Sequence, residues 1–344
     1  MNDVQPNDAA AVGTAVRQLL ADSLGYLPAA ALRVVARFGV ADHLAGGPRT
    51  AGELAEMTGV NAGHLARVLR FLASRGVFRQ DETGAFHLTT AAAMLRSDSP
   101  LPLSPTVLLF TDDLYWRPAG KLDEAVQSGG TRLGEIFGEQ FFDHLATNPD
   151  RARLFDDALA TMSMTEQDAI AASYQFPETG TVVDIAGGLG GFLRAVLTVN
   201  LGLRGILFDQ QPVLDRHRLD DPATKDRWET VRGDFFESVP ADADFYVLKR
   251  IVHDKSERDA LRILGSCRKA MTERSRLLII DAVVPTGEDC PPSIALSDVL
   301  MLAVFEGKER TAAEYEELLA KAELKVNRII PTPTSLSIVE AVVA

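Results

Sequence analysis

The segment Val182-Val-Asp-Ile-Ala-Gly-Gly-Leu-Gly-Gly-Phe-Leu193 is the strongest indication of the fold, because it has the pattern of an apolar strand that runs into a glycine-rich turn. The apolar segment after the turn predicts a helix. Glycines at such a turn let a ligand approach the main chain, and the first turn of the helix offers free N–H groups. In an open α/β sheet the crevice at the carboxyl ends of the strands is the expected ligand site. The stretch therefore predicts a mainly parallel sheet with a ligand at this turn.

Acidic residues around the turn indicate which ligand it takes. The dinucleotide fingerprint G-x-G-x-x-G fails, because the sixth position counted from Gly188 is Leu193. Asp184 stands just before the glycines, where it would repel a pyrophosphate and attract a cation. Asp209 ends the next predicted strand, where its carboxylate can accept both hydroxyls of a ribose. Together these positions favour S-adenosylmethionine over a nicotinamide dinucleotide, whereas the glycines alone would also fit a plain strand–helix turn.

Later strand ends extend the predicted site. Asp234 and Phe235 follow a short strand and suit an adenine, the carboxylate at its edge and the ring on its face. His253 follows the strand predicted at 245–249, and it is the only one of the six histidines that sequence order places at this edge. A neutral imidazole can take a proton near pH 7, so His253 is the candidate general base.

Two further carboxylates, Asp281 and Glu309, fall at corresponding positions of the predicted sheet edge. Either one could orient the imidazole of His253 and stabilise its charged form. Taken one at a time, the histidine and the acids would also fit structural roles such as helix capping or surface solvation.

The pattern along the chain predicts two parts, which divide near residue 178. Residues 1–177 read as helical, with a capped helix over 61–76 and a small hairpin over 77–88 that together make a winged-helix pattern. In residues 178–344 short β-branched runs alternate with helical segments, which predicts a sheet covered on both faces. The strands are predicted at 181–186, 205–208, 245–249, 277–283 and 335–342.

The composition excludes several classes of function. The chain carries 35 Lys and Arg against 48 Asp and Glu, a net charge of −13, so nucleic-acid and membrane-surface partners are not expected. Two cysteines and the absence of a ligand cluster with usual spacing predict no metal site. With no signal-peptide pattern and no long apolar window, a cytoplasmic location is expected.

Together these residues resemble the small-molecule O-methyltransferases of the plant caffeate and isoflavone type, whose bacterial relatives tailor antibiotics and polyketides. The likeness spans nearly the whole chain. It is carried by the glycine motif, by Leu248-Lys-Arg-Ile-Val-His-Asp254, by Leu277-Leu-Ile-Ile-Asp-Ala-Val-Val-Pro285 and by the run at 298–322. The resemblance implies an α/β fold: a Rossmann-like, seven-strand methyltransferase sheet with an N-terminal helical, winged-helix-like dimerisation domain. It also implies a homodimer that uses S-adenosylmethionine and releases S-adenosylhomocysteine.

The resemblance also implies roles for individual residues. His253 becomes the base, and Asp281 and Glu309 lie on either side of it. The cofactor contacts fall on glycines, acids and neighbouring side chains at the strand ends: Asp184, Gly187, Gly188, Gly190, Asp209, Gln210, Asp234, Phe235 and Lys249. A pocket for a flat acceptor draws on apolar side chains of the helical segments: Trp116, Phe110, Met162, Met301 and Phe305.

The sequence departs from the family pattern at three positions. Ala186 stands where the family has its first motif glycine. Asp281 stands where a longer Glu is usual, which puts its contact with His253 in question. Lys255 replaces a tryptophan that follows the His-Asp pair, and that tryptophan is expected to serve packing.

The predicted function is S-adenosylmethionine-dependent O-methylation of a hydroxyl, phenolic or enolic, on an aromatic or polyketide-type secondary metabolite. One alternative keeps the fold but methylates nitrogen, or uses the bound cofactor for other chemistry. An alternative from another class is a winged-helix regulator that responds to a small ligand. It draws on the local positive charge of Arg67, Arg70, Arg75 and Arg79.

Overall fold

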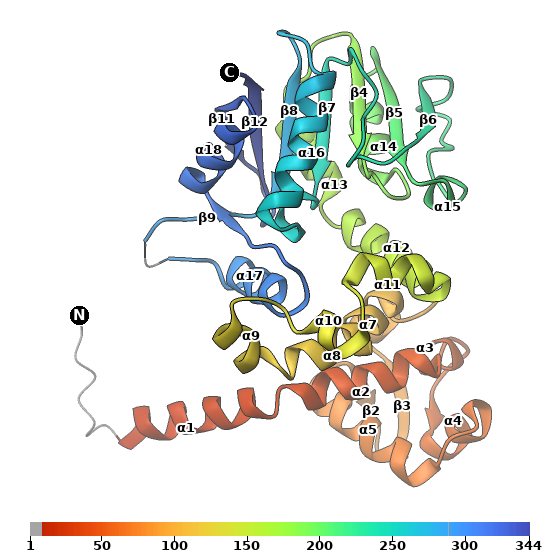
Figure 1. Ribbon diagram of the computed structural model, residues 1–344. Coiled ribbons are helices and arrows are strands. Elements are labelled where there is room, and N and C mark those ends of the chain that lie inside the picture. Colours follow the sequence, from red (N-terminus) through yellow and green to blue (C-terminus); the bar gives the residue numbers. More distant parts are fainter. Residues whose placement is uncertain (1–8, 288) are drawn as a thin grey trace. The chain divides into compact units, whose positions relative to one another are not determined.

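The computed structural model describes residues 9–287 and 289–344, which form two compact units dividing between Thr111 and Asp112 (Figure 1). The first unit contains α1 (Ala9–Ser23), α2 (Tyr26–Arg37), α3 (Val40–His43), β1 (Arg49–Thr50), α4 (Ala51–Thr58), α5 (Ala62–Ser74), β2 (Phe78–Gln80), β3 (Ala85–Leu88), α6 (Thr90–Ala93) and α7 (Ser104–Phe110).

The first unit has the predicted winged-helix pattern. Thr50 forms a capping box with Glu53 at the start of α4, and the Asn61 side chain caps α5. The hairpin β2–β3 follows α5, and β1 pairs with the outer side of β3 in an antiparallel three-stranded sheet. No single described helix is long and apolar enough to cross a membrane, although α1 and α2 together meet that test with a bend of 43° between them.

The second unit begins with helices and continues with a strand–helix alternation. Its elements are α8 (Asp113–Ala119), α9 (Leu122–Ser128), α10 (Leu133–Phe137), α11 (Phe141–Thr147), α12 (Pro149–Met164), α13 (Gln167–Ser173), β4 (Gly180–Ile185), α14 (Gly191–Val199), β5 (Leu203–Asp209), α15 (Gln211–Leu214), β6 (Trp228–Arg232), β7 (Phe245–Lys249), the 3₁₀ helix η1 (Val252–Asp254), α16 (Glu257–Ala270), β8 (Arg276–Asp281), β9 (Val283–Val284), α17 (Pro292–Val304), β10 (Arg310–Thr311), α18 (Ala312–Lys321), β11 (Leu324–Pro331) and β12 (Ser337–Val343).

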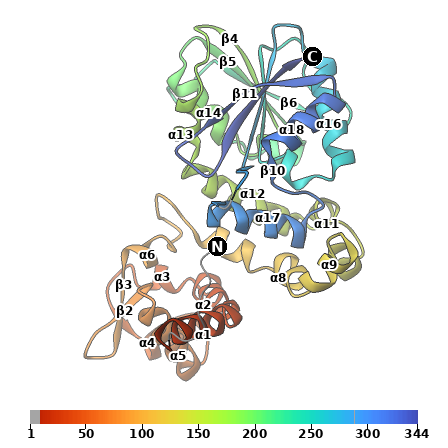
Figure 2. The same ribbon diagram turned by 90° about the vertical axis from the view of Figure 1, so that its left-hand side faces the viewer.

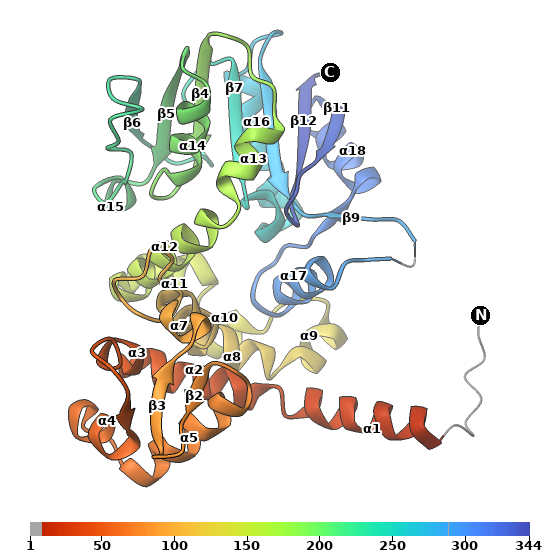
Figure 3. The ribbon, with the colours of Figure 1, turned by 180° about the vertical axis from the view of Figure 1, so that it is seen from behind.

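Seven strands of this unit form one sheet in the order β11-β12-β8-β7-β4-β5-β6. The ladders from β8 across to β6 are parallel, and β12 runs antiparallel to both of its neighbours. Helices α13 and α14 lie on one face of the sheet, and α16 and α18 lie on the other (Figures 2 and 3).

Alternate residues of the central strand β4 enter the two opposite cores. Val183 and Ile185 pack among residues of α16 and α18, whereas Val182 packs among residues of α13 and α14. A strand buried on both faces reads as a continuous apolar run, which is why the sequence marked it so clearly.

The structure confirms the predicted strands and adds detail at the carboxyl end. The run predicted at 277–283 divides into β8 and β9, and β9 pairs with β10 in a separate parallel ladder. The strand β11 was not among those predicted. Polar residues such as Asn327 and Arg328 interrupt its apolar pattern, because it forms an edge of the sheet.

The boundary between the compact units does not coincide with the division predicted at residue 178. Helix α13 packs against α14, and Ile170 and Tyr174 share a core with β4 and β5. The helices from α8 to α13 therefore belong with the sheet by packing, whereas the division at 178 follows the change of element type.

Candidate active site

The carboxyl ends of the parallel strands bring the predicted residues to one edge of the sheet (Figure 1). The glycine turn follows β4, Asp209 ends β5, Lys249 ends β7 and Asp281 ends β8. Because these strands are parallel in one sheet, residues far apart in the sequence meet at this edge.

The glycine turn is shaped by close contacts that a side chain would disturb. A Cβ at Gly187 would lie 2.5 Å from Oδ2 of Asp184, and one at Gly190 would lie 2.7 Å from Cδ2 of Leu219. At Gly188, with φ of +59°, a Cβ would meet nothing within 4 Å. The turn therefore packs tightly against its own unit at two glycines and presents open main chain at the third.

Ala186, which stands where the resemblance leads us to expect a glycine, also has a positive φ, +52°. Its N–H donates to the carbonyl oxygen of Phe208 at 2.7 Å. A left-handed backbone costs a non-glycine residue about 1–2 kcal/mol, so this hydrogen bond and the surrounding turn hold the alanine in a conformation that glycine would adopt freely.

Asp209 is fixed by two main-chain donors. Its Oδ2 accepts from the N–H of Gly188 at 2.9 Å, and its Oδ1 accepts from the N–H of Gln210 at 2.7 Å. Burial raises the pKa of this carboxyl to about 6, against the two amide bonds that lower it. The carboxylate thus joins the glycine turn to the end of β5 and can still accept hydrogen bonds on its other lone pairs.

A small cavity opens beside Asp209. Four of the residues predicted for the cofactor lie in its wall, together with Phe208 and Gly233. The complete lining is Phe208, Asp209, Gln210, Gly233, Asp234 and Phe235. The structure therefore brings the predicted ribose and adenine residues to one place.

Asp184 is a buried acid with an unused oxygen. Its side chain lies directly beneath the glycine turn and is 1% exposed, and Oδ2 has no hydrogen-bond partner among the described residues. Burial raises the pKa of Asp184 to about 7, while the nearby Lys249 ammonium lowers it. An unpaired buried carboxylate is costly, so a positive ligand at the turn would stabilise it.

His253 lies on η1, just after β7, and pairs with Glu309. Its Nδ1 lies 2.9 Å from Oε1 of Glu309, and Ser297 Oγ donates to the same oxygen at 2.5 Å. The Glu309 N–H donates to Oδ1 of Asp298 at 2.9 Å, which fixes the loop that carries the glutamate. Because a carboxylate only accepts, Nδ1 carries the hydrogen in the neutral ring and Nε2 is left as the acceptor.

The charges around His253 raise its pKa above the ordinary imidazole value. Burial alone lowers the pKa, but the charge of Asp281, the Glu309 hydrogen bond and the charge of Asp254 outweigh it. Glu309 shows the opposite response: burial raises its pKa, and the His253 hydrogen bond and charge lower it overall.

Asp281 makes its hydrogen bond elsewhere. Tyr315 OH donates to its Oδ2 at 3.2 Å, and Oδ1 has no hydrogen-bond partner in the described part of the chain. Burial raises the pKa of this fully buried carboxyl. The shorter side chain therefore acts on His253 through its charge, and Glu309 is the acid that holds the ring.

Five rings of the second unit make a cluster that we call the aromatic cluster. Phe305, just after α17, lies 4.6 Å from Phe141 and 6.4 Å from Tyr115, centroid to centroid. The complete cluster is Tyr115, Phe141, Phe142, Phe155 and Phe305. Tyr115, Phe141 and Phe305 are buried, so these rings pack chiefly against one another.

Lys255, which stands where the resemblance leads us to expect a tryptophan, joins this cluster to the histidine segment. Its Nζ lies 3.4 Å from the centroid of Phe142 and 2.8 Å from Oδ1 of Asp254. The lysine thus takes a packing role against an aromatic ring, as expected for the residue it replaces, and its charge is balanced by Asp254.

The five residues predicted to bind the acceptor lie in different parts of the structure and differ in their burial. Phe305 and Met301 are buried at the end of α17, and Phe305 is in the aromatic cluster. Trp116 on α8 is 36% exposed, and α8 packs against α17. Met162 lies near the end of α12, whereas Phe110 lies on α7 of the first unit.

Comparison with known proteins decides the family. The sequence pattern of the O-methyltransferase domain matches residues 119–325, and that of the O-methyltransferase dimerisation domain matches residues 22–98. The chain belongs to the O-methyltransferase family. A phenazine O-methyltransferase from Lysobacter antibioticus is 40% identical over 319 residues, 92% of this chain and 93% of that protein.

Solved structures of relatives agree with this assignment. A methyltransferase of calicheamicin biosynthesis, in its S-adenosylhomocysteine-bound form, is 43% identical with a TM-score of 0.81, over 96% of this chain and 98% of that one. An O-methyltransferase from neocarzinostatin biosynthesis, in complex with S-adenosylmethionine and 2-hydroxy-5-methyl naphthoic acid, is 33% identical with a TM-score of 0.78, over 92% and 96%. Other relatives are named N-methyltransferases.

This O-methyltransferase uses S-adenosylmethionine as its methyl donor. The described residues fit that cofactor, because Asp184 has an unpaired oxygen for a positive ligand and Gly188 presents open main chain. The alternative of a winged-helix regulator loses its support, since the winged-helix segment matches the dimerisation domain of an enzyme family.

Sequence reasoning missed several residues that meet at this site. Glu166 and Arg250 form a buried ion pair beside Lys249, and Ser297 and Tyr315 bind the two acids near His253. No pattern around Glu166 marked it, because its partners lie far along the chain. Among the described residues, no group of three or more His, Cys, Asp or Glu side chains could hold a metal ion.

Proposed function

We propose that this O-methyltransferase methylates a phenolic or enolic hydroxyl of an aromatic or polyketide-type metabolite, with His253 as general base. The observation that carries the proposal is the Nδ1 hydrogen bond to Glu309, which leaves Nε2 of a buried imidazole as an acceptor. Relatives that act on phenazines and on hydroxylated naphthoic acids support an aromatic acceptor.

On the acceptor side, each residue has a separate role in binding the ring or in removing the proton. The aromatic cluster and Met301 hold the acceptor ring, and Nε2 of His253 takes the hydroxyl proton as the oxygen begins to bond to carbon. Glu309 keeps the ring in the required tautomer and stabilises the imidazolium that forms. Asp281 adds negative charge on the same side.

On the cofactor side, we propose that Asp209 and Gln210 hold the ribose, and Asp234 and Phe235 hold the adenine. Gly187, Gly188 and Gly190 let the main chain approach the ligand, and Asp184 and Lys249 face its charged end. S-adenosylmethionine, when bound, supplies an electrophilic methyl on a positively charged sulfur. The oxygen attacks in line with the departing sulfur, so the products are a methyl ether and S-adenosylhomocysteine.

An intact-mass screen tests the acceptor class. Hydroxylated aromatics and the matching aromatic amines are incubated with the enzyme and S-adenosylmethionine, and the molecular mass of each product is measured by mass spectrometry. We expect a gain of one methyl on hydroxylated members only. A methyl gained by an amine while no hydroxylated aromatic reacts would contradict O-methylation and would favour the N-methyltransferase alternative.

The pH dependence of kcat/KM gives a second test. A general base works when neutral, so activity rises with pH through the pKa of His253 and levels off above it. Because Asp281, Glu309 and Asp254 raise that pKa, the midpoint of the acid limb is expected above the ordinary imidazole value. A profile that is flat through this range in the wild-type enzyme would contradict the base assignment.

We also propose a homodimer formed through the first unit, in line with the dimerisation domain matched at residues 22–98. Apolar side chains of α1 support this, because Val12, Val16, Leu19 and Leu20 are exposed in the single chain. Light scattering at micromolar concentration would give a dimer, and a monomer there would contradict the proposal.

We also propose a cytoplasmic location. Such a location suits the free thiols of Cys267 and Cys290, and it can be checked by cell fractionation.

A further inference from the structure

Between α12 and α13, one buried carboxylate holds two cations. Glu166 has a side chain only 9% exposed, and its Oε1 accepts from Lys249 Nζ at 2.7 Å. Arg250 donates to the same carboxylate twice, from Nη2 to Oε2 at 2.8 Å and from Nε to Oε1 at 3.1 Å. A two-pronged arginine–carboxylate pair fixes both side chains in direction as well as in distance.

The two cations belong to different halves of the site. Lys249 lies at the end of β7 and attracts the buried carboxylate of Asp184, beneath the glycine turn. Arg250 is the next residue, yet its charge acts on Asp281 and Glu309, the acids beside His253. Glu166 therefore stands between the charges of the cofactor side and those of the base.

The backbone at Arg250 needs such support. Its φ is +57°, a left-handed conformation that costs a non-glycine residue about 1–2 kcal/mol. The Arg250 N–H donates to the carbonyl oxygen of Ile280 at 3.0 Å, and Glu166 holds the other end of the residue. The strained turn leads directly into the segment that carries His253, so a change at Arg250 would be felt at the base.

We propose that Glu166 is a positioning residue, which holds Lys249 and Arg250 in place and keeps the charge of Arg250 balanced near His253. This inference rests on the proposed role of His253 as base. Glu166 itself acts through its two partners, and its contribution is to set where their positive charges lie.

The electrostatic consequence has a definite sign. Without the Glu166 carboxylate, the positive charge of Arg250 is no longer balanced, and it interacts more strongly with Asp281 and Glu309. A more positive surrounding disfavours the imidazolium, so the pKa of His253 falls. The other charges that face His253, from Asp281 on β8, Glu309 before β10 and Asp254 on η1, are unchanged by this substitution.

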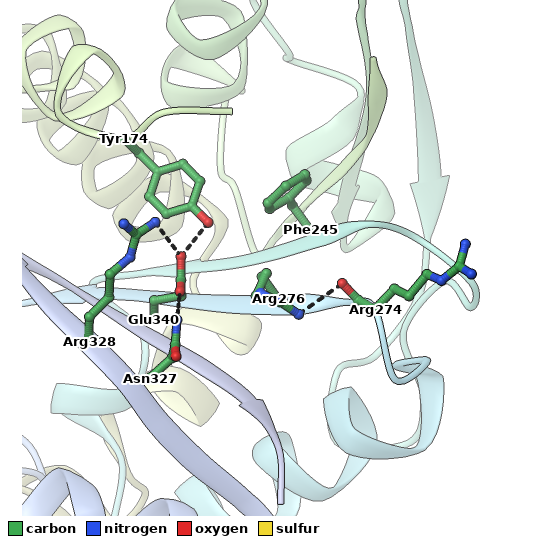
Figure 4. A pocket seen from close by; sticks show the side chains of 7 residues that line it. All are labelled: Tyr174, Phe245, Arg274, Arg276, Asn327, Arg328 and Glu340. Carbon is green, nitrogen blue, oxygen red and sulfur yellow. Dashed lines mark hydrogen bonds and ion pairs between the residues drawn. The ribbon is translucent and has the colours of Figure 1, made fainter. Parts of the chain in front are cut away.

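A matched control is available at the opposite edge of the sheet. Glu340 on β12 is 2% exposed, and its Oε2 accepts from Tyr174 OH at 2.5 Å and from Arg328 NH2 at 2.9 Å (Figure 4). It lies in a cavity where β7 and β8 begin, away from their carboxyl ends. The lining is Tyr174, Phe245, Arg274, Arg276, Asn327, Arg328 and Glu340.

The experiment compares Glu166→Gln with Glu340→Gln in the full-length enzyme. For Glu166→Gln we expect the acid limb of kcat/KM to move to lower pH by about 0.5 unit or more, and KM for S-adenosylmethionine to rise by about 3–10-fold. For Glu340→Gln we expect a lower melting temperature with the limb in its wild-type position. Glu166→Asp keeps the negative charge, so the acid limb of this variant is expected to lie close to its wild-type pH.

Two results would overturn the inference. One is a Glu166→Gln limb that coincides with the wild-type limb, and the other is an equal shift in Glu340→Gln. If Glu166→Gln does not fold, the KM of Glu166→Asp for S-adenosylmethionine decides. The shorter acid keeps the charge, but it holds Lys249 less well, so this KM is still expected to rise. A wild-type profile without any acid limb would instead contradict His253 as base, so the two failures can be told apart.

Discussion

Replacing His253 with alanine is expected to lower kcat at pH 7 by about 10²–10⁴-fold, the usual contribution of a general base. The hydroxyl of a phenol has a pKa near 10, so little phenolate is present at neutral pH without a base. The affinity for S-adenosylmethionine, measured by calorimetry, is expected to change less than about 3-fold. Most of the predicted cofactor residues follow β4, β5 and β6, and Lys249 at the end of β7 bonds to Ser163 and Glu166 and not to His253.

A second buried histidine supplies the control for this experiment. His144 on α11 also pairs with a glutamate, since its Nδ1 lies 2.8 Å from Oε1 of Glu139, but it is not on the strand-end segment. His144→Ala is expected to lower the melting temperature and to keep most of kcat. Full turnover by His253→Ala at pH 7 with cofactor bound would show that another group, or none, removes the proton.

Replacing Asp209 with asparagine is expected to weaken S-adenosylmethionine binding by about 30-fold or more. The carboxylate accepts from the N–H groups of Gly188 and Gln210, and an amide has only one oxygen with which to do so. One N–H would lose its partner, and the charge available to the ribose would also be lost, at about 1.5–3 kcal/mol for a charged hydrogen bond.

Asp244 is the matched control for Asp209. Its Oδ2 accepts from the N–H of Thr181 at 2.8 Å, at the start of β4 and not at its carboxyl end. Asp244→Asn is expected to weaken this charge-assisted hydrogen bond, to lower stability slightly and to leave cofactor affinity close to wild type. Equal cofactor affinities for Asp209→Asn and the wild-type enzyme would contradict the proposed role of Asp209 in cofactor binding.

Local sequence patterns were sufficient to predict most strands of the sheet and the edge at which the candidate site residues lie. The apolar run of β4, its glycine turn and the acid at the end of β5 all depend on residues close together in the chain, so their geometry follows from the strand–turn–helix pattern. The parallel order of the strands then places His253 and Asp281 at the same edge. Glu309 comes close to this edge because β10, which begins at Arg310, pairs with β9 just after Asp281. The hydrogen bond between His253 and Glu309 follows from that topology together with the turn before β10.

The contacts that sequence could not predict are those between side chains from distant segments. Glu166 meets Lys249 across 83 positions, and no local pattern marks a glutamate between two helices as their partner. Asp281 binds Tyr315, because an aspartate is one methylene shorter than the usual glutamate and a tyrosine of α18 is within reach. Lys255 packs on Phe142, a ring that belongs to a helix more than 100 positions earlier. Each of these depends on how elements pack, which periodicity does not specify.

The central claim is that the methyl reaches an oxygen whose proton His253 has removed. The most direct measurement uses S-adenosylmethionine with a ¹³C-labelled methyl group and an acceptor that carries a hydroxyl and an amine on neighbouring ring carbons. The product of a single turnover is then read by NMR for the wild-type enzyme and for His253→Ala. We expect a labelled methoxy group from the wild-type enzyme and almost none from the variant. A label on nitrogen, or an equal methoxy yield from both proteins, would contradict it.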